Sequence, residues 1–267
     1  MRKRTLAVFI ALLFVCAVAV HAVTWGEPDG QNHPHVGTIL FLASDGYLYS
    51  CSGTLLSPTI MVTAGHCTST NGVPNLYTWV SFEPNITFPP GPISLAYLNK
   101  NWIKATAIPH PQYDDYAQFP NTYDVGVVVL KKGVDLATYG ELPPLGLLDL
   151  VAKQPANGRL FTVVGYGMQG YLKPFYGDDW ERYVGTVRLI ELNSTYDGDQ
   201  ASAKFSNNPG STSGGSCYGD SGGPVFYGTS NIVSAVVSWG ITPCIGVDYQ
   251  FRLDTPTAQD FVKQYLE

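Results

Sequence analysis

Short apolar runs separated by turn residues recur along most of the chain. The runs are rich in β-branched and aromatic side chains and end near Gly, Pro, Asn or Asp, which is typical of β-strands joined by tight turns. Many short strands of this kind predict an all-β sandwich or barrel. The expected strands span residues 36–43, 47–56, 59–63, 76–82, 103–108, 126–130, 160–166, 184–191, 224–227, 232–239 and 247–253.

Three segments depart from this pattern. Residues 68–123 are rich in Pro, Asn and Gly, which excludes long helices there. We interpret residues 131–157 as a connector between two halves. Near the C-terminus, Thr255 and Pro256 form a helix start, and the apolar residues after them recur on one helical face. We therefore expect a terminal helix over residues 255–266.

The N-terminus has the layout of a secretory signal peptide. Basic residues at positions 2–4 precede an apolar run over 6–20, which is too short for a comfortable membrane span. We expect cleavage after Ala22, which makes residues 1–22 the signal peptide and Val23 the first residue of a secreted, extracellular protein. A membrane anchor is the alternative.

Charge narrows the classes of partner. Only 13% of the 267 residues are charged, and the formal net charge is −6. Removal of the signal peptide takes away three basic residues and no acidic ones, so the charge moves from −6 to −9. An acidic surface argues against nucleic acid and anionic membranes as partners.

Four cysteines remain after the signal peptide is removed. An even count in an exported chain indicates disulfides. A zinc site is the alternative, but it usually needs a closely spaced cysteine pair, which this chain lacks. The four residues, Cys51, Cys67, Cys217 and Cys244, allow three pairings.

The segment Gly-Asp-Ser-Gly-Gly-Pro at 219–224 places Ser221 in a glycine-rich loop. A serine hydroxyl is a weak nucleophile that needs a base and an orienting acid. His66 offers the base, and Asp124, which precedes an apolar run, offers the acid. Each of the three is an ordinary turn or packing residue when taken alone. In the order His, Asp, Ser they match one of the known triad arrangements, so we expect nucleophilic catalysis.

These motifs resemble those of the trypsin-like serine proteases of the chymotrypsin fold. The matching segments lie at residues 63–67, 124–130, 219–224 and 238–240. The resemblance implies an all-β fold of two packed six-stranded antiparallel β-barrels with a C-terminal α-helix. The disulfides that it implies are Cys51–Cys67 and Cys217–Cys244.

The resemblance also implies one trypsin-like peptidase domain over residues 23–267. The first barrel would span about 36–135 and the second about 155–253, followed by the helix at 255–266. The catalytic cleft would then lie between the barrels.

The same resemblance implies the catalytic roles. Ser221 would attack the substrate carbonyl, His66 would transfer the proton, and Asp124 would orient the imidazole. The backbone N–H groups of Gly219 and Ser221 would form the oxyanion hole.

Asp220 would pair with the α-ammonium group of Val23 and so shape the oxyanion loop. The family's usual start, Ile-Val-Gly-Gly, differs here at Trp25. Since no Lys or Arg occurs between Arg4 and Lys100, a trypsin-type activating cut is excluded, and signal removal itself would create the terminus. Capping of its own loop by Asp220 is the alternative.

Substrate specificity is inferred from the position six residues before the nucleophile. In the family it lies at the base of the primary pocket, where an Asp selects Lys or Arg. Here it is Gly215, followed by Ser216. A buried cation without a carboxylate is costly, so we expect an apolar or aromatic P1 residue, with Gly240 leaving the pocket wall open. Ser238 and Trp239 would pair with the extended substrate by strand addition.

The sequence therefore predicts a secreted, monomeric serine endopeptidase that hydrolyses polypeptides through an acyl-enzyme, without a cofactor. No metal site is expected, because His33 and His35 lack a third ligand. Two alternatives are a catalytically silent homologue used as a binding module and an esterase-like hydrolase.

Overall fold

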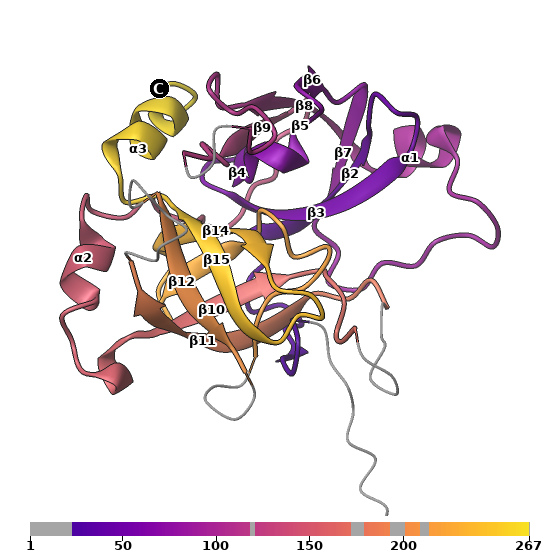
Figure 1. The fold of residues 1–267 in the computed structure, drawn as a ribbon. Helices are drawn as coiled ribbons and strands as arrows, with labels where there is room; N and C mark the ends of the chain where they lie inside the picture. Colours follow the sequence, from indigo (N-terminus) through magenta and orange to yellow (C-terminus); the bar gives the residue numbers. More distant parts are fainter. Residues whose placement is uncertain (1–22, 118–120, 172–178, 193–200, 209–213, 267) are drawn as a thin grey trace, which may run out of the picture.

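The computed structural model describes residues 23–117, 121–171, 179–192, 201–208 and 214–266. The predicted signal peptide lies outside these residues. Figure 1 shows two stacked β-structures, formed by the first and second halves of the chain. No helix of the described ranges is long and apolar enough to cross a membrane.

The first half forms a closed antiparallel barrel of six strands. Its strands alternate side chains between the barrel interior and the outside, which places Ile39, Leu55, Met61, Val80 and Val128 in a common core. The strand order is β2 (Val36–Leu42), β3 (Leu48–Leu55), β4 (Ile60–Thr63), β9 (Gly126–Leu130), β8 (Ile103–Pro109) and β7 (Tyr77–Ser81), with β7 pairing back on β2.

The second half forms the other six-stranded barrel, because β11 pairs with both β10 and β12. Phe161, Val187, Phe205 and Val225 fill its core. The strand order is β11 (Tyr183–Glu191), β10 (Leu160–Gly165), β13 (Pro224–Tyr227), β14 (Val233–Gly240), β15 (Gly246–Arg252) and β12 (Ser202–Asn207), and the short β1 (Glu27–Pro28) adds to β11.

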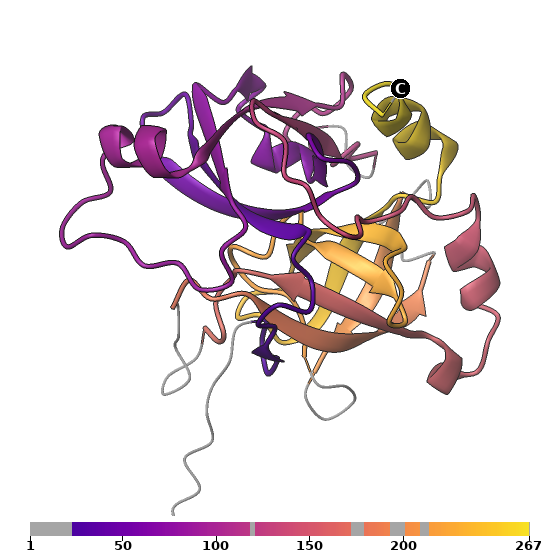
Figure 2. The ribbon, with the colours of Figure 1, turned by 180° about the vertical axis from the view of Figure 1, so that it is seen from behind.

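The two barrels pack through a shared apolar cluster. Val62 and Val127 of the first barrel and Val164 and Phe226 of the second belong to this cluster, all without exposed area. Phe261 of the C-terminal helix α3 (Pro256–Lys263) joins it. In both views α3 lies beside the first barrel although it follows the last strand of the second (Figures 1 and 2). The helix therefore joins the two barrels.

Two helix starts carry a side-chain cap, and the one at Thr255 is the cap that the sequence predicts. Thr255 accepts a hydrogen bond from the N–H of Ala258 at the start of α3, and Ser94 does the same for Tyr97 at α1. The remaining short elements are α1 (Leu95–Asn101), α2 (Leu147–Val151), the 3-10 turns η1 (Gly65–Cys67) and η2 (Ala156–Gly158), and β5 (Ser69–Thr70) with β6 (Val73–Pro74).

A buried ion pair fixes the N-terminal segment between the barrels. Arg182 has no exposed area, and its Nε lies 2.8 Å from Asp29 Oδ2. The same guanidinium donates to the carbonyls of Gly30 and Val36. Because a buried guanidinium needs several acceptors, this network sets the path from β1 to β2.

The predicted fold of two six-stranded barrels with a terminal helix is confirmed. The apolar pattern does not predict β12, because four of its six residues are polar or charged. This strand forms through its pairing with β15 and β11.

Candidate active site

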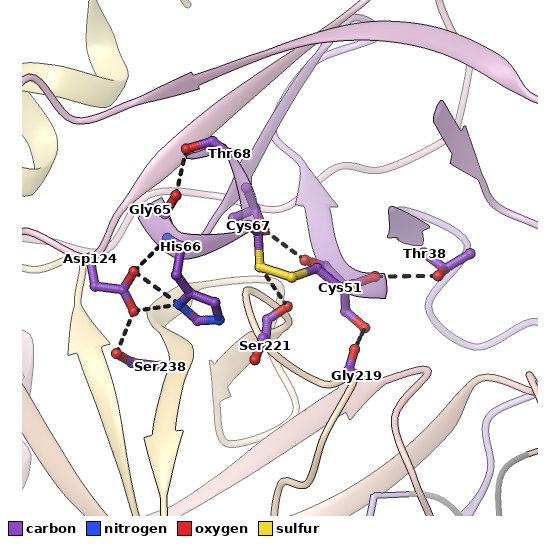
Figure 3. The surroundings of a disulfide bond; sticks show 12 residues. Thr38, Cys51, Gly65, His66, Cys67, Thr68, Asp124, Gly219, Ser221 and Ser238 are labelled. Carbon is purple, nitrogen blue, oxygen red and sulfur yellow. Dashed lines mark hydrogen bonds and ion pairs between the residues drawn. A yellow bond between two sulfur atoms is a disulfide. The ribbon is translucent and has the colours of Figure 1, made fainter. Parts of the chain in front are cut away.

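A cleft of about 860 Å³ runs between the barrels and brings the sequence motifs together. His66 and Tyr116 line it from the first barrel, and Ser221 and Trp239 line it from the second. In Figure 3 the ring of His66 lies between Asp124 and Ser221. The three residues come from segments far apart in the chain, so the packing of the barrels creates the arrangement.

His66 is held on the turn η1 by its partner acid and by a disulfide. Its Nδ1 lies 3.0 Å from Asp124 Oδ2, and its backbone N–H donates to Asp124 Oδ1 at 2.9 Å. The next residue, Cys67, is bonded to Cys51 of β3. Backbone and side chain thus fix the imidazole with Nδ1 toward the acid, which leaves Nε2 for the cleft.

Asp124 is fully buried and receives two further hydrogen bonds. Ser238 Oγ donates to its Oδ2 at 2.5 Å and the Tyr116 hydroxyl donates to the same oxygen at 2.8 Å. Ser238 was predicted to contact substrate, and its hydroxyl also contacts the acid. The sequence pattern does not identify Tyr116, because nothing in the 68–123 segment signals that this side chain folds back onto Asp124.

The charge on Asp124 controls the protonation of His66. Burial opposes protonation of the imidazole, but the adjacent carboxylate outweighs it and raises the pKa of His66 above its usual value. Burial likewise opposes ionisation of Asp124, and the His66 charge and hydrogen bond lower the pKa of that carboxyl. The pair therefore consists of a carboxylate and a base that is stabilised when it receives a proton.

The loop that carries Ser221 is shaped by two glycines. Gly219 and Gly222 have φ values of +97° and +77°, in the region that favours glycine. A β-carbon on Gly222 would lie 1.9 Å from Thr63 Oγ1, so the loop packs closely against β4. Within the described residues, neither the Gly219 N–H nor the Ser221 N–H donates to another group, and both residues line the cleft.

The Ser221 hydroxyl makes no hydrogen bond to His66 in this part of the structure. Such bonds are often long before a substrate binds and shorten in the complex. The carbonyl of Ser221 accepts from the Ser52 N–H at 2.8 Å, which ties the nucleophile loop to β3.

Asp220 is a buried carboxyl held by backbone groups. It accepts from the N–H of Gly167 at 2.8 Å and from that of Cys217 at 2.9 Å. Burial raises the pKa of Asp220 to about 7. Among the described side chains none gives it a cationic partner.

The predicted substrate-binding residues are not all in the cleft. Ser216, Ser238, Trp239 and Gly240 line it, but Gly215 does not. Gly215 instead packs against Asn207, where a β-carbon would lie 1.9 Å from Oδ1. The second disulfide, Cys217–Cys244, joins the serine loop to the segment after β14.

Asp248 also lines this cleft, opposite Gly240 on the neighbouring strand. Sequence inspection overlooks it because only the pairing of β14 with β15 brings it there. The sequence feature that could identify Asp248 is an acidic residue on the strand after Cys244, at the position that pairs with Gly240.

The site offers no convincing metal ligands in the described residues. His66, Cys51 and Cys67 have ligand atoms within 4.8 Å of one another. However, the two sulfurs are joined in a disulfide and are not available as thiolates.

We expect Tyr116→Phe to move the acid limb of kcat/KM to higher pH by about half to one unit. The Tyr116 hydroxyl stays protonated, because burial and the Asp124 charge raise its pKa. The hydrogen bond from this hydroxyl stabilises the Asp124 carboxylate more when His66 is neutral than when His66 is protonated. Its loss therefore raises the pKa of His66. Losing a hydrogen bond to a charged group costs about 1.5–3 kcal/mol, and part of that difference appears as a pKa shift.

The measurement is the pH–rate profile of the free enzyme on a peptide ester. Tyr113→Phe is the matched control, because the Tyr113 hydroxyl donates at 3.0 Å to Asp115 rather than to Asp124. An acid limb that stays in place, or moves to lower pH, contradicts the assigned role of Tyr116.

Comparisons with known proteins agree with this geometry. The sequence matches the family described as Trypsin over residues 25–261. A trypsin from Saccharopolyspora erythraea is 28% identical over 221 residues, covering 80% of this chain and 86% of the relative. A chymase from Papio hamadryas is 25% identical and covers 86% of each chain. A solved structure of HL collagenase superposes with a TM-score of 0.65 at 16% identity, over 92% of this chain and 98% of that one.

Proposed function

Because the chain belongs to the trypsin family of serine endopeptidases, we propose that it hydrolyses peptide bonds through a triad of Ser221, His66 and Asp124. The observation that carries this proposal is the bond between His66 Nδ1 and the buried Asp124, in a cleft that Ser221 also lines. A serine nucleophile needs such a base, oriented by a third group.

The mechanism proceeds through two transfers on Ser221. Its Oγ attacks the scissile carbonyl carbon while its proton passes to His66 Nε2, and the oxyanion accepts hydrogen bonds from the N–H groups of Gly219 and Ser221. The tetrahedral intermediate then collapses and its C–N bond breaks, while the His66 imidazolium gives the proton from Ser221 to the leaving amine. Water then attacks the acyl-enzyme with His66 again as base, which releases the carboxylic acid and restores Ser221. Asp124 stabilises the imidazolium throughout.

Labelling and substrate tests distinguish a serine endopeptidase from the two alternative functions. A silent homologue would not react with an organophosphate, and an esterase-like hydrolase would cleave simple esters but not proteins. We expect the purified protein to cleave both casein and peptide esters, since the same acyl-enzyme serves both. Cleavage of esters alone would overturn the peptidase proposal.

We propose that the protein is secreted and that signal removal also activates it. Asp220 is buried without a cationic partner in the described residues, and Val23 is packed in the core of the second barrel. Thr24 forms an antiparallel β-bridge with Gly215, which lies six residues before Ser221. Trp25 has a φ of +65°, a conformation that glycine favours, which fits the glycine at this place in the family's usual start. These contacts support an ion pair between the Val23 ammonium and Asp220.

We expect a protein that begins at Val23 to be at least about 100-fold more active than one that keeps Ala22. Breaking a buried ion pair costs about 3–5 kcal/mol, and the loss would disorder the oxyanion loop. The measurement is kcat/KM of the two forms, with N-terminal sequencing of the active secreted protein. Equal activities, or an active form that begins well downstream of Val23, would rule out this activation route.

The apolar or aromatic P1 preference is an expectation from the sequence alone. It assumed a primary pocket without a carboxylate. Asp248, on the cleft wall, changes that premise.

A further inference from the structure

Asp248 is an acid built into the wall of the substrate cleft. It lies on β15, where it pairs with Gly240 of β14, and only 1% of its surface is exposed. The same cleft contains Ser221 and Ser216. A carboxylate in such a position can act directly on a bound substrate side chain.

The hydrogen bonds of Asp248 hold its carboxylate in one orientation and leave one acceptor position open. Oδ2 accepts from the Ser216 N–H at 2.8 Å and from Ser216 Oγ at 2.7 Å, and Oδ1 accepts from Asn207 Nδ2 at 2.8 Å. A carboxylate offers roughly four acceptor sites, so Oδ1 keeps one. A β-carbon on Gly240 would lie 2.8 Å from this oxygen, and glycine therefore leaves space beside it.

The carboxylate is charged at neutral pH and lacks a counter-ion. Burial raises the pKa of Asp248 to about 6, against the hydrogen bonds from Asn207 and Ser216 that lower it. Within the described chain no cationic side chain pairs with it. The other buried acid nearby is Asp220, whose pKa the Asp248 charge helps to raise. An unpaired buried charge is costly, and a cation brought by the substrate would compensate it.

We propose that Asp248 is the specificity residue of the primary pocket and that it binds the ammonium or guanidinium group of a Lys or Arg side chain at P1. The inference rests on the proposed endopeptidase function and names its substrate class. The apolar stem of such a side chain would pack against Val237 and Trp239, which also line the cleft. The acid thus comes from β15 and not from the position of Gly215.

The test compares two peptides that differ only in Arg or Phe at P1. We expect Asp248→Ser to lower the ratio of kcat/KM for Arg over Phe by at least about 30-fold, the lower end for losing one member of a buried charge pair. The ratio is independent of the fraction of folded protein, so partial unfolding of the variant does not obscure the result. Asp248→Asn should lower the ratio in the same direction.

Asp115→Asn is the matched control, because Asp115 lines the same cleft without contacting Ser216. It should leave the Arg/Phe ratio within about threefold, since a partly solvated charge contributes little to the binding of one side chain. A ratio that Asp248→Ser also leaves within threefold would overturn the proposal and make Asp248 a structural residue.

A binding experiment separates this inference from the catalytic proposal. Benzamidine, an aromatic amidinium cation, is titrated calorimetrically into the Ser221→Ala protein and into the same protein with Asp248→Ser. We expect binding to the first and at least about 30-fold weaker binding to the second. Equal or absent binding in both overturns the Asp248 inference, whereas a wild-type protein that binds benzamidine but cleaves no peptide overturns the proposed function alone.

Discussion

Replacing Ser221 by Ala is expected to lower kcat by about 10⁶-fold, the loss known when the nucleophile of a Ser-His-Asp enzyme is removed. The remaining activity would come from the oxyanion donors and substrate binding. Stability should change by less than about 0.5 kcal/mol, because the Ser221 side chain makes no hydrogen bond within the described structure. The measurement is single-turnover and steady-state kinetics on a peptide ester, beside thermal unfolding.

The control is Ser44→Ala, which changes an exposed serine in the turn between β2 and β3. It should leave kcat unchanged. A Ser221→Ala protein that keeps a tenth or more of its activity would show that another residue is the nucleophile.

Asp124→Asn is expected to lower kcat by about 10⁴-fold at neutral pH while the protein stays folded. An amide at this place can donate to His66 Nδ1, which favours the imidazole tautomer that cannot take the Ser221 proton. The magnitude is that of the same change in an established Ser-His-Asp triad. The Ser238 and Tyr116 hydroxyls can still bond to the remaining amide oxygen, so the local structure has partners.

The measurement is kcat against pH for Asp124→Asn and for Asp115→Asn, which removes an acid from the same cleft. Asp115 contacts Tyr113 and the Gly72 backbone rather than the imidazole, so its variant should lose less than about tenfold. A loss below tenfold for Asp124→Asn as well would mean that Asp124 does not orient the base.

Local sequence patterns were sufficient for most strands and for the candidate triad. The strand β9 is an uninterrupted apolar run, and the loop at 219–224 carries its glycines and serine within six residues. Such features can be predicted from the sequence because the residues that produce them are neighbours in the chain. The C-terminal helix was predictable for the same reason, since Thr255 and Pro256 directly precede it.

Features that depend on long-range pairing could not be predicted in this way. Asp248 reaches the cleft only because β15 pairs with β14, and Tyr116 reaches Asp124 through a backbone turn with φ +63°. Arg182 directly precedes β11, and only the packing of the barrels buries it against Asp29. The surroundings of Gly215 also depend on such pairing, because Asn207 on β12 lies beside it.

The most direct test of the proposed triad is labelling with an organophosphate fluoride, followed by peptide mapping by mass spectrometry. We predict one adduct per molecule of the protein that begins at Val23, located on Ser221 and absent from the His66→Ala variant, because His66 must take the serine proton. An unlabelled protein, or an adduct on any other residue, would contradict the assignment of Ser221, His66 and Asp124 as a catalytic triad.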